Sequence, residues 1–376
     1  MYKIGTLNKI SPAGLDRLTD EYTLTEDIQE ANGIILRSYN MHEMELSDQL
    51  LAVGRAGAGV NNIPLDKCAE KGIVVFNAPG ANANAVKELC ISGMLMAARN
   101  IPEGIEWLNS LEVTPEVGKA VEKGKGQFAG TEIKGKTLGI IGLGAIGVLV
   151  ANAAEKLGMN VIGYDPFLSV KAAHSLSNTI RVVDAEKDLY PECDYISIHV
   201  PATDETKGMI NAEAFERMKD GVVFLNFARD KLVNDTDLLS ALESGKVKKY
   251  VTDFPNETVL GKKGVLALPH LGASSAEAEE NCAIMAADRI MDYLENGNIV
   301  NSVNMPLCTL GPKKGTRVAV ISKADAGALE KVASIVDGDV ISKARGDYAY
   351  TLAETSGDID PEAISGEGII RVRILK

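Results

Sequence analysis

Short apolar runs alternate with segments of helical spacing over the first hundred residues. Four of these runs are rich in Ile, Val and Leu and have the length of buried strands: 3–7, 33–38, 50–57 and 73–79. The first segment between runs begins with Ser11 and Pro12, which predicts a helix with Ser11 as its N-cap. Strand–helix alternation of this kind predicts a parallel sheet that helices cover on both faces.

The same alternation resumes further along the chain. Residues 84–100 have helical spacing with Asn84 as candidate N-cap, and the polar, glycine-bearing segment 101–134 is typical of a hinge or an exposed crossover. Residues 275–296 show one long amphipathic pattern, which predicts a helix. Between these segments, seven strand-like runs, most of them separated by segments of helix length, predict a second doubly wound domain: 137–142, 160–165, 179–183, 195–200, 221–229, 249–254 and 264–270.

The pattern changes again after the linker at 304–315, which contains Pro-Lys-Lys-Gly. A strand, a helix, a hairpin with its turn at 345–347, a helical turn and a last strand follow. This order predicts a small β-α-β-β-α-β domain of about sixty residues.

Composition narrows the choice of partners and compartment. The formal net charge of −13 argues against a nucleic-acid surface and an anionic membrane face, while local charges still allow a small anionic substrate. The five cysteines are odd in number and form no C-x-x-C pair, so we expect a reduced compartment with neither zinc nor disulfide bonds. The start shows no secretion signal, and the apolar run 138–151 is shorter than the ~20 residues that span a membrane. We therefore expect a cytoplasmic protein.

The glycines of residues 137–166 carry the strongest local signal. Gly142, Gly144 and Gly147 fit G-x-G-x-x-G between an apolar strand and a helix-like segment, and Asp165 closes the next strand. Such glycines allow a tight turn, close approach of backbone N–H groups to a pyrophosphate, and close helix packing. A carboxylate at Asp165 accepts hydrogen bonds from ribose hydroxyls and repels a 2′-phosphate. The stretch therefore predicts a dinucleotide site that prefers NAD to NADP.

Three later strands end near side chains that can do chemistry: Arg229, Glu257 and His270. Alone, each has an ordinary explanation, as a surface charge, a solvated loop carboxylate or a structural histidine. Ligands of an open α/β sheet bind beyond the carboxyl ends of its strands, so beside a nicotinamide cofactor the three side chains form a coherent catalytic apparatus.

The dinucleotide-binding stretch 137–166, called the fingerprint below, is one of several motifs whose order along the chain is informative. It ends in Tyr-Asp-Pro, and Asn-Phe-Ala-Arg, Thr-Asp-Phe-Pro-Asn-Glu and Pro-His-Leu-Gly-Ala-Ser follow in that order. This combination resembles the D-isomer-specific 2-hydroxyacid dehydrogenases, with N-x-A-R-G and Asp-Val-Phe…Glu as the family's versions of the middle two. Leu-Arg-Ser, Gly-Arg-Ala-Gly-Ala-Gly-Val and the C-terminal domain are similar to the phosphoglycerate dehydrogenase branch with an ACT-type domain. The likeness runs over 1–306 and more loosely over 314–376.

The resemblance implies an α/β fold with two doubly wound parallel-sheet domains and a small α+β domain. These are a flavodoxin-like substrate-binding domain (1–99 and 283–306), a Rossmann NAD-binding domain (100–282) and an ACT-like domain (314–376). It also implies NAD-dependent oxidation of D-3-phosphoglycerate to 3-phosphohydroxypyruvate in serine biosynthesis, without a metal, by a homo-oligomer of two or four chains.

The resemblance also implies roles for single residues. His270 is expected to take the hydroxyl proton as hydride leaves C2, which suits an imidazole with a reference pKa near ~6.5. Glu257 is expected to hold that ring, and Arg229 to bind the substrate carboxylate through a bidentate fork. The expected substrate contacts are Arg37, Ser38, Gly57 and Asn82, and the expected cofactor contacts are Ala58, Gly142, Gly144, Ala145, Ile146, Gly147, Asp165, Val200, Phe227, Ala228, Asp253 and Gly272.

Several positions depart from the family pattern. Ala145 stands where Arg is common. Asp230 replaces the Gly after Arg229, so the local turn must differ. The Asp253–Glu257 spacing is one residue short, which leaves the acidic partner of His270 open. The loop after the first C-terminal strand lacks the Pro-Gly, Asn and His that could hold an amino-acid effector. We therefore expect this domain to serve oligomerisation and L-serine to inhibit weakly or not at all.

Two residues and two other functions stay open at this point. Arg55 fits a phosphate ligand and an ion-pair partner equally well, and Lys87 is a candidate extra phosphate contact. The same motifs fit a reductase for another 2-keto acid, such as glyoxylate or hydroxypyruvate, and an NAD(H)-sensing protein without catalysis. Arg37 separates the substrates, because only a phosphorylated acid needs a cation so far from the carboxylate. An intact acid–base set makes catalysis the simpler account.

Overall fold

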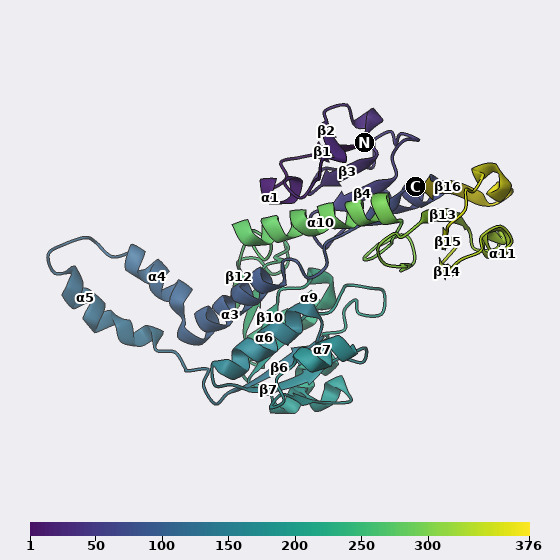
Figure 1. Cartoon of the computed structure of the whole chain (residues 1–376). Helices are drawn as coiled ribbons and strands as arrows, with labels where there is room; N and C mark the ends of the chain where they lie inside the picture. Colours follow the sequence, from purple (N-terminus) through teal and green to yellow (C-terminus); the bar gives the residue numbers. More distant parts are fainter. The chain divides into compact units, whose positions relative to one another are not determined.

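The computed structural model describes all 376 residues and divides into two units, residues 1–82 with 276–376 and residues 83–275 (Figure 1). The first unit contains a five-stranded parallel sheet in the order β2-β1-β3-β4-β5, so the predicted parallel sheet is confirmed. Sequence reasoning missed β2, because this edge strand buries only one of its four residues. The strands are β1 (Tyr2–Leu7), β2 (Tyr22–Thr25), β3 (Gly33–Leu36), β4 (Ala52–Arg55) and β5 (Val74–Phe76).

Helix α10 (Ala276–Asn296) packs against this sheet, as the amphipathic pattern predicts. Glycine permits a close approach: a Cβ on Gly54 of β4 would lie 2.8 Å from the side chain of Ile290. The neighbouring short helices are α1 (Pro12–Leu15), η1 (Ile28–Glu30) and α2 (Leu65–Glu70).

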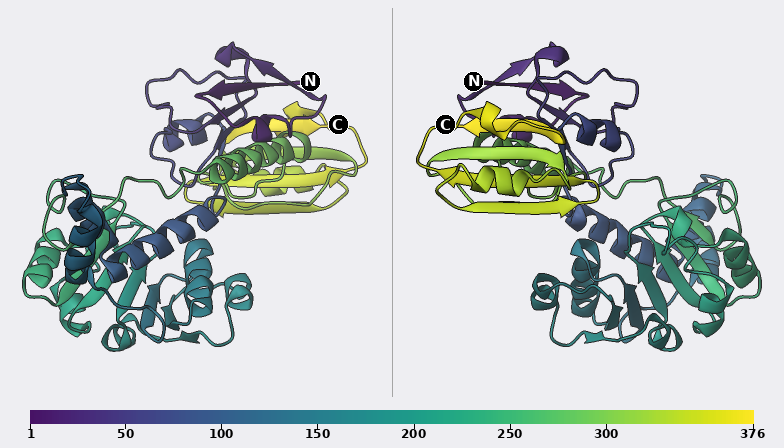
Figure 2. Two further views of the ribbon diagram at one scale, coloured as in Figure 1. Left: turned by 90° about the vertical axis from the view of Figure 1, so that its left-hand side faces the viewer. Right: turned by 90° about the vertical axis from the view of Figure 1, so that its right-hand side faces the viewer.

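A four-stranded antiparallel sheet in the order β14-β15-β13-β16 closes the first unit. Helix α11 and the turn η6 cover one face, and α10 lies against the other (Figure 2). The predicted β-α-β-β-α-β order is confirmed, although the second helix is reduced to a 3₁₀ turn. The elements are β13 (Thr316–Lys323), α11 (Ala328–Ala333), β14 (Val340–Arg345), β15 (Tyr348–Thr355), η6 (Pro361–Ile364) and β16 (Ile369–Leu375).

The C-terminal sheet shares one hydrophobic core with α10 and the first parallel sheet. Arginines fix the contact: Arg373 donates to the carbonyls of Tyr293 (3.2 Å) and Leu294 (2.8 Å) near the end of α10, where partial negative charge gathers. Arg317 is fully buried and donates to the Glu354 carboxylate at 2.9 Å. The C-terminal sheet is therefore packed as part of the first unit, and the three domain boundaries expected from the sequence stay a prediction.

The second unit contains a seven-stranded parallel sheet in the order β12-β11-β10-β9-β6-β7-β8, which confirms the second doubly wound domain. Its strands are β6 (Thr137–Ile141), β7 (Asn160–Tyr164), β8 (Arg181–Val182), β9 (Tyr195–Ile198), β10 (Val222–Asn226), β11 (Val247–Thr252) and β12 (Val265–Ala267). Its helices include α3 (Ala83–Arg99), α6 (Ala145–Lys156), α7 (Val170–Ser175), α8 (Ala212–Arg217) and α9 (Asp235–Glu243), with 3₁₀ turns η3 (Glu186–Asp188), η4 (Tyr190–Glu192) and η5 (Asp230–Leu232).

Of the two helix caps expected from the sequence, Ser11 is confirmed in its position and Asn84 is wrong. Ser11 precedes α1, but its side chain forms no capping hydrogen bond, and the four-residue helix begins at Pro12, whose ring suits a first turn. Helix α3 begins at Ala83, so Asn84 lies inside its first turn and donates to the Glu88 carboxylate at 2.9 Å.

The segment expected to be a hinge or crossover folds as a helical arm. It consists of α4 (Ile101–Asn109), α5 (Val117–Gly124) and η2 (Lys125–Phe128), which extend away from the sheet of the second unit (Figure 1). The rings of Trp107 and Phe128 lie 5.3 Å apart and hold the two sides of the arm together. A Cβ on Gly124 would lie 2.3 Å from the Trp107 ring, so glycine is needed at this crossing.

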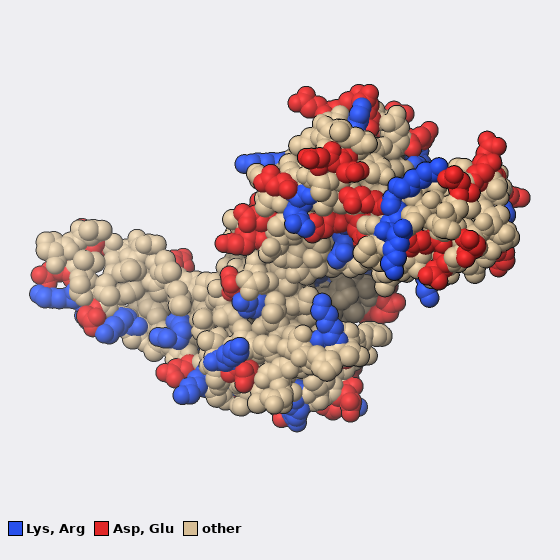
Figure 3. Space-filling view, viewed as in Figure 1, with Lys and Arg blue, Asp and Glu red and all other residues tan.

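Acidic and basic side chains are mixed over the face shown in Figure 3, in keeping with the moderate negative charge. No helix of the structure has both the length and the apolar character needed to cross a membrane.

Candidate active site

The turn between β6 and α6 is built around the three fingerprint glycines. Gly142 has φ +95°, which side chains disfavour, and a Cβ on Gly147 would lie 1.9 Å from the Gly142 carbonyl oxygen. A Cβ on Gly144 would meet no atom within 4 Å, so this glycine leaves open space above the turn. Two glycines are therefore needed by the fold, and the third keeps the turn accessible to a ligand.

Helix α6 offers its free N–H groups to that space. Its first main-chain hydrogen bond runs from Val148 N to Gly144 O (3.1 Å), so the N–H groups of Ala145, Ile146 and Gly147 have no acceptor within the helix. An amino terminus of this kind favours a pyrophosphate. The residues present therefore fit a dinucleotide, with Ala145 contributing backbone only.

Asp165 lies directly after β7 and is fixed beside the turn. One carboxylate oxygen accepts from Leu143 N and the other from Phe167 N, both at 2.8 Å. Both bonds hold a negative charge at the position where ribose hydroxyls bind in this fold. The arrangement fits NAD and disfavours a 2′-phosphate.

Asn226 shapes the segment that carries Arg229. This buried amide accepts from the N–H groups of Ala228 (3.1 Å) and Arg229 (3.2 Å) and donates to the Arg229 carbonyl (2.8 Å). Phe227 turns into the core, where a Cβ on Gly93 would lie 2.7 Å from its ring. Two expected cofactor contacts, Phe227 and Ala228, therefore lie in a turn that a side chain holds rigidly.

Arg229 and His270 contact the same aromatic ring. The Arg229 guanidinium carbon lies 5.1 Å from the centroid of Phe254, and the His270 ring centroid lies 4.3 Å from it at an interplanar angle of 48°. Arg229 also donates to the Ala228 carbonyl at 2.6 Å. The structure thus brings together a cation and an imidazole that are far apart in sequence.

Asp253 is the buried carboxylate of this cluster. Burial raises its pKa to about 6, while hydrogen bonds from its own N–H and from Gly272 and the charge of Arg229 lower it. A Cβ on Gly272 would lie 3.2 Å from Val86 and 3.4 Å from Asp253, so the first turn of α3 borders the loop after His270. Near neutral pH this buried group carries a charge that has only partial compensation.

The two departures in this region have simple geometric consequences. Asp230 begins the 3₁₀ turn η5 without a positive φ, so the missing glycine causes no strain. Asn256 accepts from Thr258 N and Val259 N and thereby caps the short turn in which Glu257 is exposed. The partnership of Glu257 with His270 stays a prediction.

The other histidines of the chain lie outside the Arg229 cluster, and His174 is exposed on helix α7. His199, before the expected cofactor contact Val200, is buried with its Nε2 2.9 Å from Ser197 Oγ, and burial lowers its pKa to about 4. His42 lies in the first unit, with Nε2 3.0 Å from the Asn61 carbonyl. His270 is exposed on a loop beside Arg229, as proton transfer to a substrate requires.

A second group of charges lies at the carboxyl ends of β3 and β4 in the first unit. Arg37 forms an ion pair of 2.5 Å with Glu279 in the first turn of α10. Burial raises the pKa of the Cys282 thiol, and the nearby positive charges of Arg55 and Arg37 lower it. Both arginines therefore carry positive charge near Cys282 on α10, and the cluster is a candidate anion site.

The remaining expected substrate contacts, and the expected cofactor contact Ala58, are residues of the first unit. Ser38 N donates to the Asn8 carboxamide at 3.1 Å, and Gly57 takes an extended turn with φ +156°. Ala58 is exposed, and its carbonyl accepts from Asn77 at 2.6 Å. Asn82 is half-buried directly before α3. Lys87, in that helix, forms an ion pair of 3.6 Å with Glu88, and its role as a phosphate contact stays a prediction.

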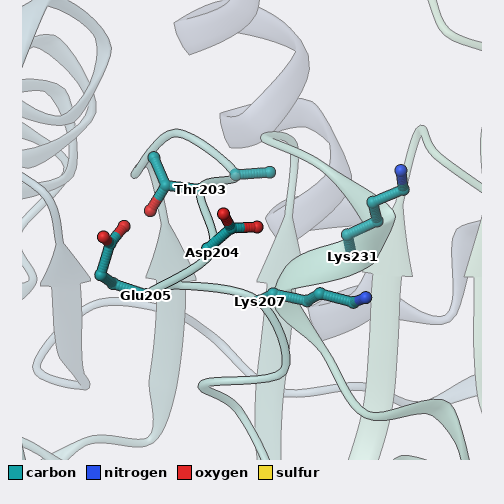
Figure 4. Close-up of a pocket in the computed structure, with 6 residues that line it drawn as sticks. Thr203, Asp204, Glu205, Lys207 and Lys231 are labelled. Atoms are coloured by element: carbon teal, nitrogen blue, oxygen red, sulfur yellow. The ribbon is translucent and has the colours of Figure 1, made fainter.

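A cavity of about 440 Å³ opens beside the segment that follows β9. Figure 4 shows two acidic side chains, Asp204 and Glu205, and two basic ones, Lys207 and Lys231, around the cavity. The two negative and two positive charges balance. The cavity has no excess charge to select an anion, and no group of three His, Cys, Asp or Glu side chains in the structure could hold a metal ion.

A glycine turn for a dinucleotide and an Arg–His pair on one doubly wound sheet define a nicotinamide-dependent dehydrogenase. The model of the D-isomer specific 2-hydroxyacid dehydrogenase, NAD binding domain, matches residues 91–273. The D-3-phosphoglycerate dehydrogenase of Methanocaldococcus jannaschii is 33% identical over 94% of this chain and 68% of its own length. The chain belongs to the D-isomer-specific 2-hydroxyacid dehydrogenase family, and its second unit is an NAD-binding domain.

Two further comparisons agree with this assignment. The human D-3-phosphoglycerate dehydrogenase is 34% identical over 76% of this chain, which spans about half (53%) of that protein. The NAD⁺-bound 3-phosphoglycerate dehydrogenase structure of Entamoeba histolytica is 28% identical, with a TM-score of 0.63 over 81% of this chain and 99% of that one.

Sequence reasoning overlooked three residues that shape these clusters: Asn226, Phe254 and Glu279. Asn226 and Phe254 belong to the motifs quoted above. An Asn whose side chain can accept from backbone N–H groups two or three residues later is a recognisable turn signal. Glu279 gives no local signal, because its partner Arg37 is distant in the chain.

Proposed function

We propose that this protein oxidises D-3-phosphoglycerate to 3-phosphohydroxypyruvate with NAD⁺, a step of serine biosynthesis. The observation that carries the proposal is the placement of Arg229 and His270 on one ring, Phe254, within an NAD-binding domain. A carboxylate anchor beside a proton carrier is what the oxidation of a 2-hydroxy acid requires.

Bound NAD⁺ supplies the acceptor for the hydride that leaves C2. Arg229 binds the substrate carboxylate through paired N–H donors, and His270 takes the proton of the C2 hydroxyl, so that a keto group forms. Glu257 stabilises the resulting imidazolium. In the reverse reaction His270 returns the proton to the C2 oxygen.

Arg37 and Ser38 bind the substrate phosphate in this proposal, with Arg55 as a second cation. The support is the shared position of both arginines beside Cys282. Glu279 neutralises Arg37 through an ion pair, and the phosphate competes with this carboxylate for the guanidinium. Gly57 and Asn82 are the other two proposed substrate contacts.

The functional form is proposed to be a homo-oligomer that joins through the helical arm. Ile105 and Leu108 of α4 are 54% and 47% exposed, and with Ile101 they form one apolar stripe. Figure 3 shows the visible face of this arm as largely uncharged between scattered charged side chains. A second copy of the chain covers the stripe. We also propose a cytoplasmic location, which the five free, buried cysteines support.

The first test is NAD⁺ reduction by the purified protein with D-3-phosphoglycerate, D-glycerate, D-lactate and 2-hydroxyglutarate. We expect a strong preference for the phosphorylated acid, and a loss of ~10²-fold or more in kcat for His270→Ala. The control His42→Ala, an exposed histidine of the first unit, should retain activity. Activity with only an unphosphorylated acid would point to a reductase for another keto acid, and NADH binding without any turnover would point to a sensing protein.

A further inference from the structure

Phe254 contacts both of the side chains to which the reaction is assigned. Its ring lies under the Arg229 guanidinium at 5.1 Å and against the His270 imidazole at 4.3 Å. The main chain fixes the base of this side chain, since Phe254 N donates to Thr252 Oγ1 at 3.0 Å and the buried Asp253 precedes it. The ring is only partly buried, so filling the core does not account for its presence.

Arg229 and His270 both need to be oriented without losing the groups that serve the substrate. Contact with the face of an aromatic ring restricts the rotation of a side chain without using one of its hydrogen-bond donors. Arg229 uses one N–H on the Ala228 carbonyl, and its guanidinium carbon lies over the Phe254 ring. One rigid ring therefore sets the separation of a cation and an imidazole.

We propose that Phe254 is a positioning residue that fixes the carboxylate anchor Arg229 relative to the proton carrier His270. The inference rests on the roles proposed above for these two residues. A misplacement of about 1 Å costs up to ~10²-fold in rate when reacting groups must meet in one geometry. Loss of the ring therefore weakens substrate binding and slows proton transfer together, while the glycine turn that binds the cofactor is untouched.

The test compares Phe254→Leu, which removes the ring face, with Phe254→Tyr, which keeps it. We expect Phe254→Leu to raise KM for D-3-phosphoglycerate and lower kcat, with a combined loss of ~10–10²-fold in kcat/KM. The Kd for NADH, followed by nucleotide fluorescence, and the Tm should stay at the wild-type values. Phe254→Tyr should restore both kinetic constants to within a few-fold. If Phe254→Leu does not fold, Phe254→Met replaces it in the same comparison.

A double-mutant cycle separates this role from a merely structural one. In a His270→Asn background, Phe254→Leu should no longer lower kcat, because the ring acts through the imidazole. An equal loss in both backgrounds, or a Phe254→Leu enzyme with wild-type KM and kcat, would overturn the positioning role. Full activity of His270→Asn alone would remove His270 from proton transfer, whereas a wild type that does not turn over D-3-phosphoglycerate would overturn the proposed function, so the failures are distinguishable.

Discussion

Arg37 and Glu279 form an ion pair of 2.5 Å that joins the end of β3 to the first turn of α10. The pair orients the guanidinium and neutralises it in the absence of an anionic ligand. Arg55 also carries its positive charge near Cys282 on α10, so the proposed phosphate site would contain two arginines.

Arg37→Ala should therefore raise KM for D-3-phosphoglycerate by about tenfold or more, since a charge-assisted contact to the phosphate is lost. KM for D-glycerate, which lacks the phosphate, should change much less. Arg17→Ala is the matched control, because Arg17 pairs with Asp288 on the same helix at 2.9 Å but is more exposed. Steady-state kinetics of the three proteins decide the matter, and equal effects on both substrates would remove Arg37 from the phosphate site.

Substitutions of two fingerprint glycines should affect different properties, the free energy of unfolding for Gly147 and cofactor binding for Gly144. Gly147→Ala places a Cβ 1.9 Å from the Gly142 carbonyl oxygen, so we expect a loss of ~1–3 kcal/mol in the free energy of unfolding. Gly144→Ala meets no atom within 4 Å and should cost less than ~1 kcal/mol, yet weaken NADH binding by intruding where a pyrophosphate approaches α6. Urea denaturation and fluorescence titration test the pair. Wild-type NADH affinity in Gly144→Ala would contradict the assigned ligand position.

Asp253 makes a pH-dependent contribution to stability. Its pKa is raised to about 6 by burial from the ordinary value of 3.8, so the protonated form is the one that the fold favours. The contribution of this group is therefore complete below the ordinary pKa and is lost as the pH rises through about 6.

Asp253→Asn cannot ionise and should remove this loss. The free energy of unfolding of the variant, relative to that of the wild type, should rise by on the order of 1–3 kcal/mol between about pH 5 and about pH 8. Chemical denaturation at both pH values measures the difference. A difference that does not change with pH would mean that Asp253 is well compensated in the folded protein.

The C-terminal sheet should stabilise the whole first unit. Arg317→Met removes the buried cation that pairs with Glu354, and because this carboxylate is partly exposed and keeps the N–H groups of Lys314 and Gly315, we expect a cost of ~1.5–3 kcal/mol. The control is Arg181→Met, which removes an ion pair with Glu192 whose side chains are about half exposed, at 53% and 51%. Its cost should be ~1 kcal/mol or less. Equal shifts in Tm for the two variants would show that the C-terminal sheet contributes little.

The exposed apolar stripe on the helical arm allows a test of the proposed oligomer interface. Ile105→Asp combined with Leu108→Asp puts two charges into the apolar stripe of α4 and should convert the proposed homo-oligomer to monomers, because uncompensated charges are costly in an interface. Light scattering after size-exclusion chromatography measures the mass of each species. Charging Leu157, which is exposed at the end of α6, is the control and should leave the mass unchanged. An unchanged mass in the double variant would place the interface elsewhere.

Much of the fold could be predicted because its signals are local. The apolar runs found ten of the twelve strands of the two parallel sheets within a few residues of their ends, and β8 approximately. The strand that was missed, β2, has no apolar run, and the arm at 101–128 was taken for a hinge because its apolar residues are not buried within the chain. Pattern reasoning detects helices through the face that they bury, and this face is exposed here.

The candidate site could be predicted only in part. The spacing of motifs pointed to Arg229, His270 and the glycine turn, since their residue types and strand ends suit one chemistry. The position of Glu257 in an exposed turn capped by Asn256, and the burial of Asp253, follow from how the chain packs after β11. No sequence rule states which of two nearby carboxylates becomes buried.

By itself, the sequence determined that the chain forms two parallel sheets, all of their strands except β2, and the glycine turn between β6 and α6. Backbone conformation and hydrophobic period act over a few residues, so they can be read without the rest of the protein. Only the tertiary structure decided that one ring, Phe254, supports both Arg229 and His270, and that Glu279 neutralises Arg37. It also decided that the C-terminal sheet shares the core of the first unit. These contacts join residues distant in the chain, and packing selects such partners by shape and charge that only the folded chain brings together.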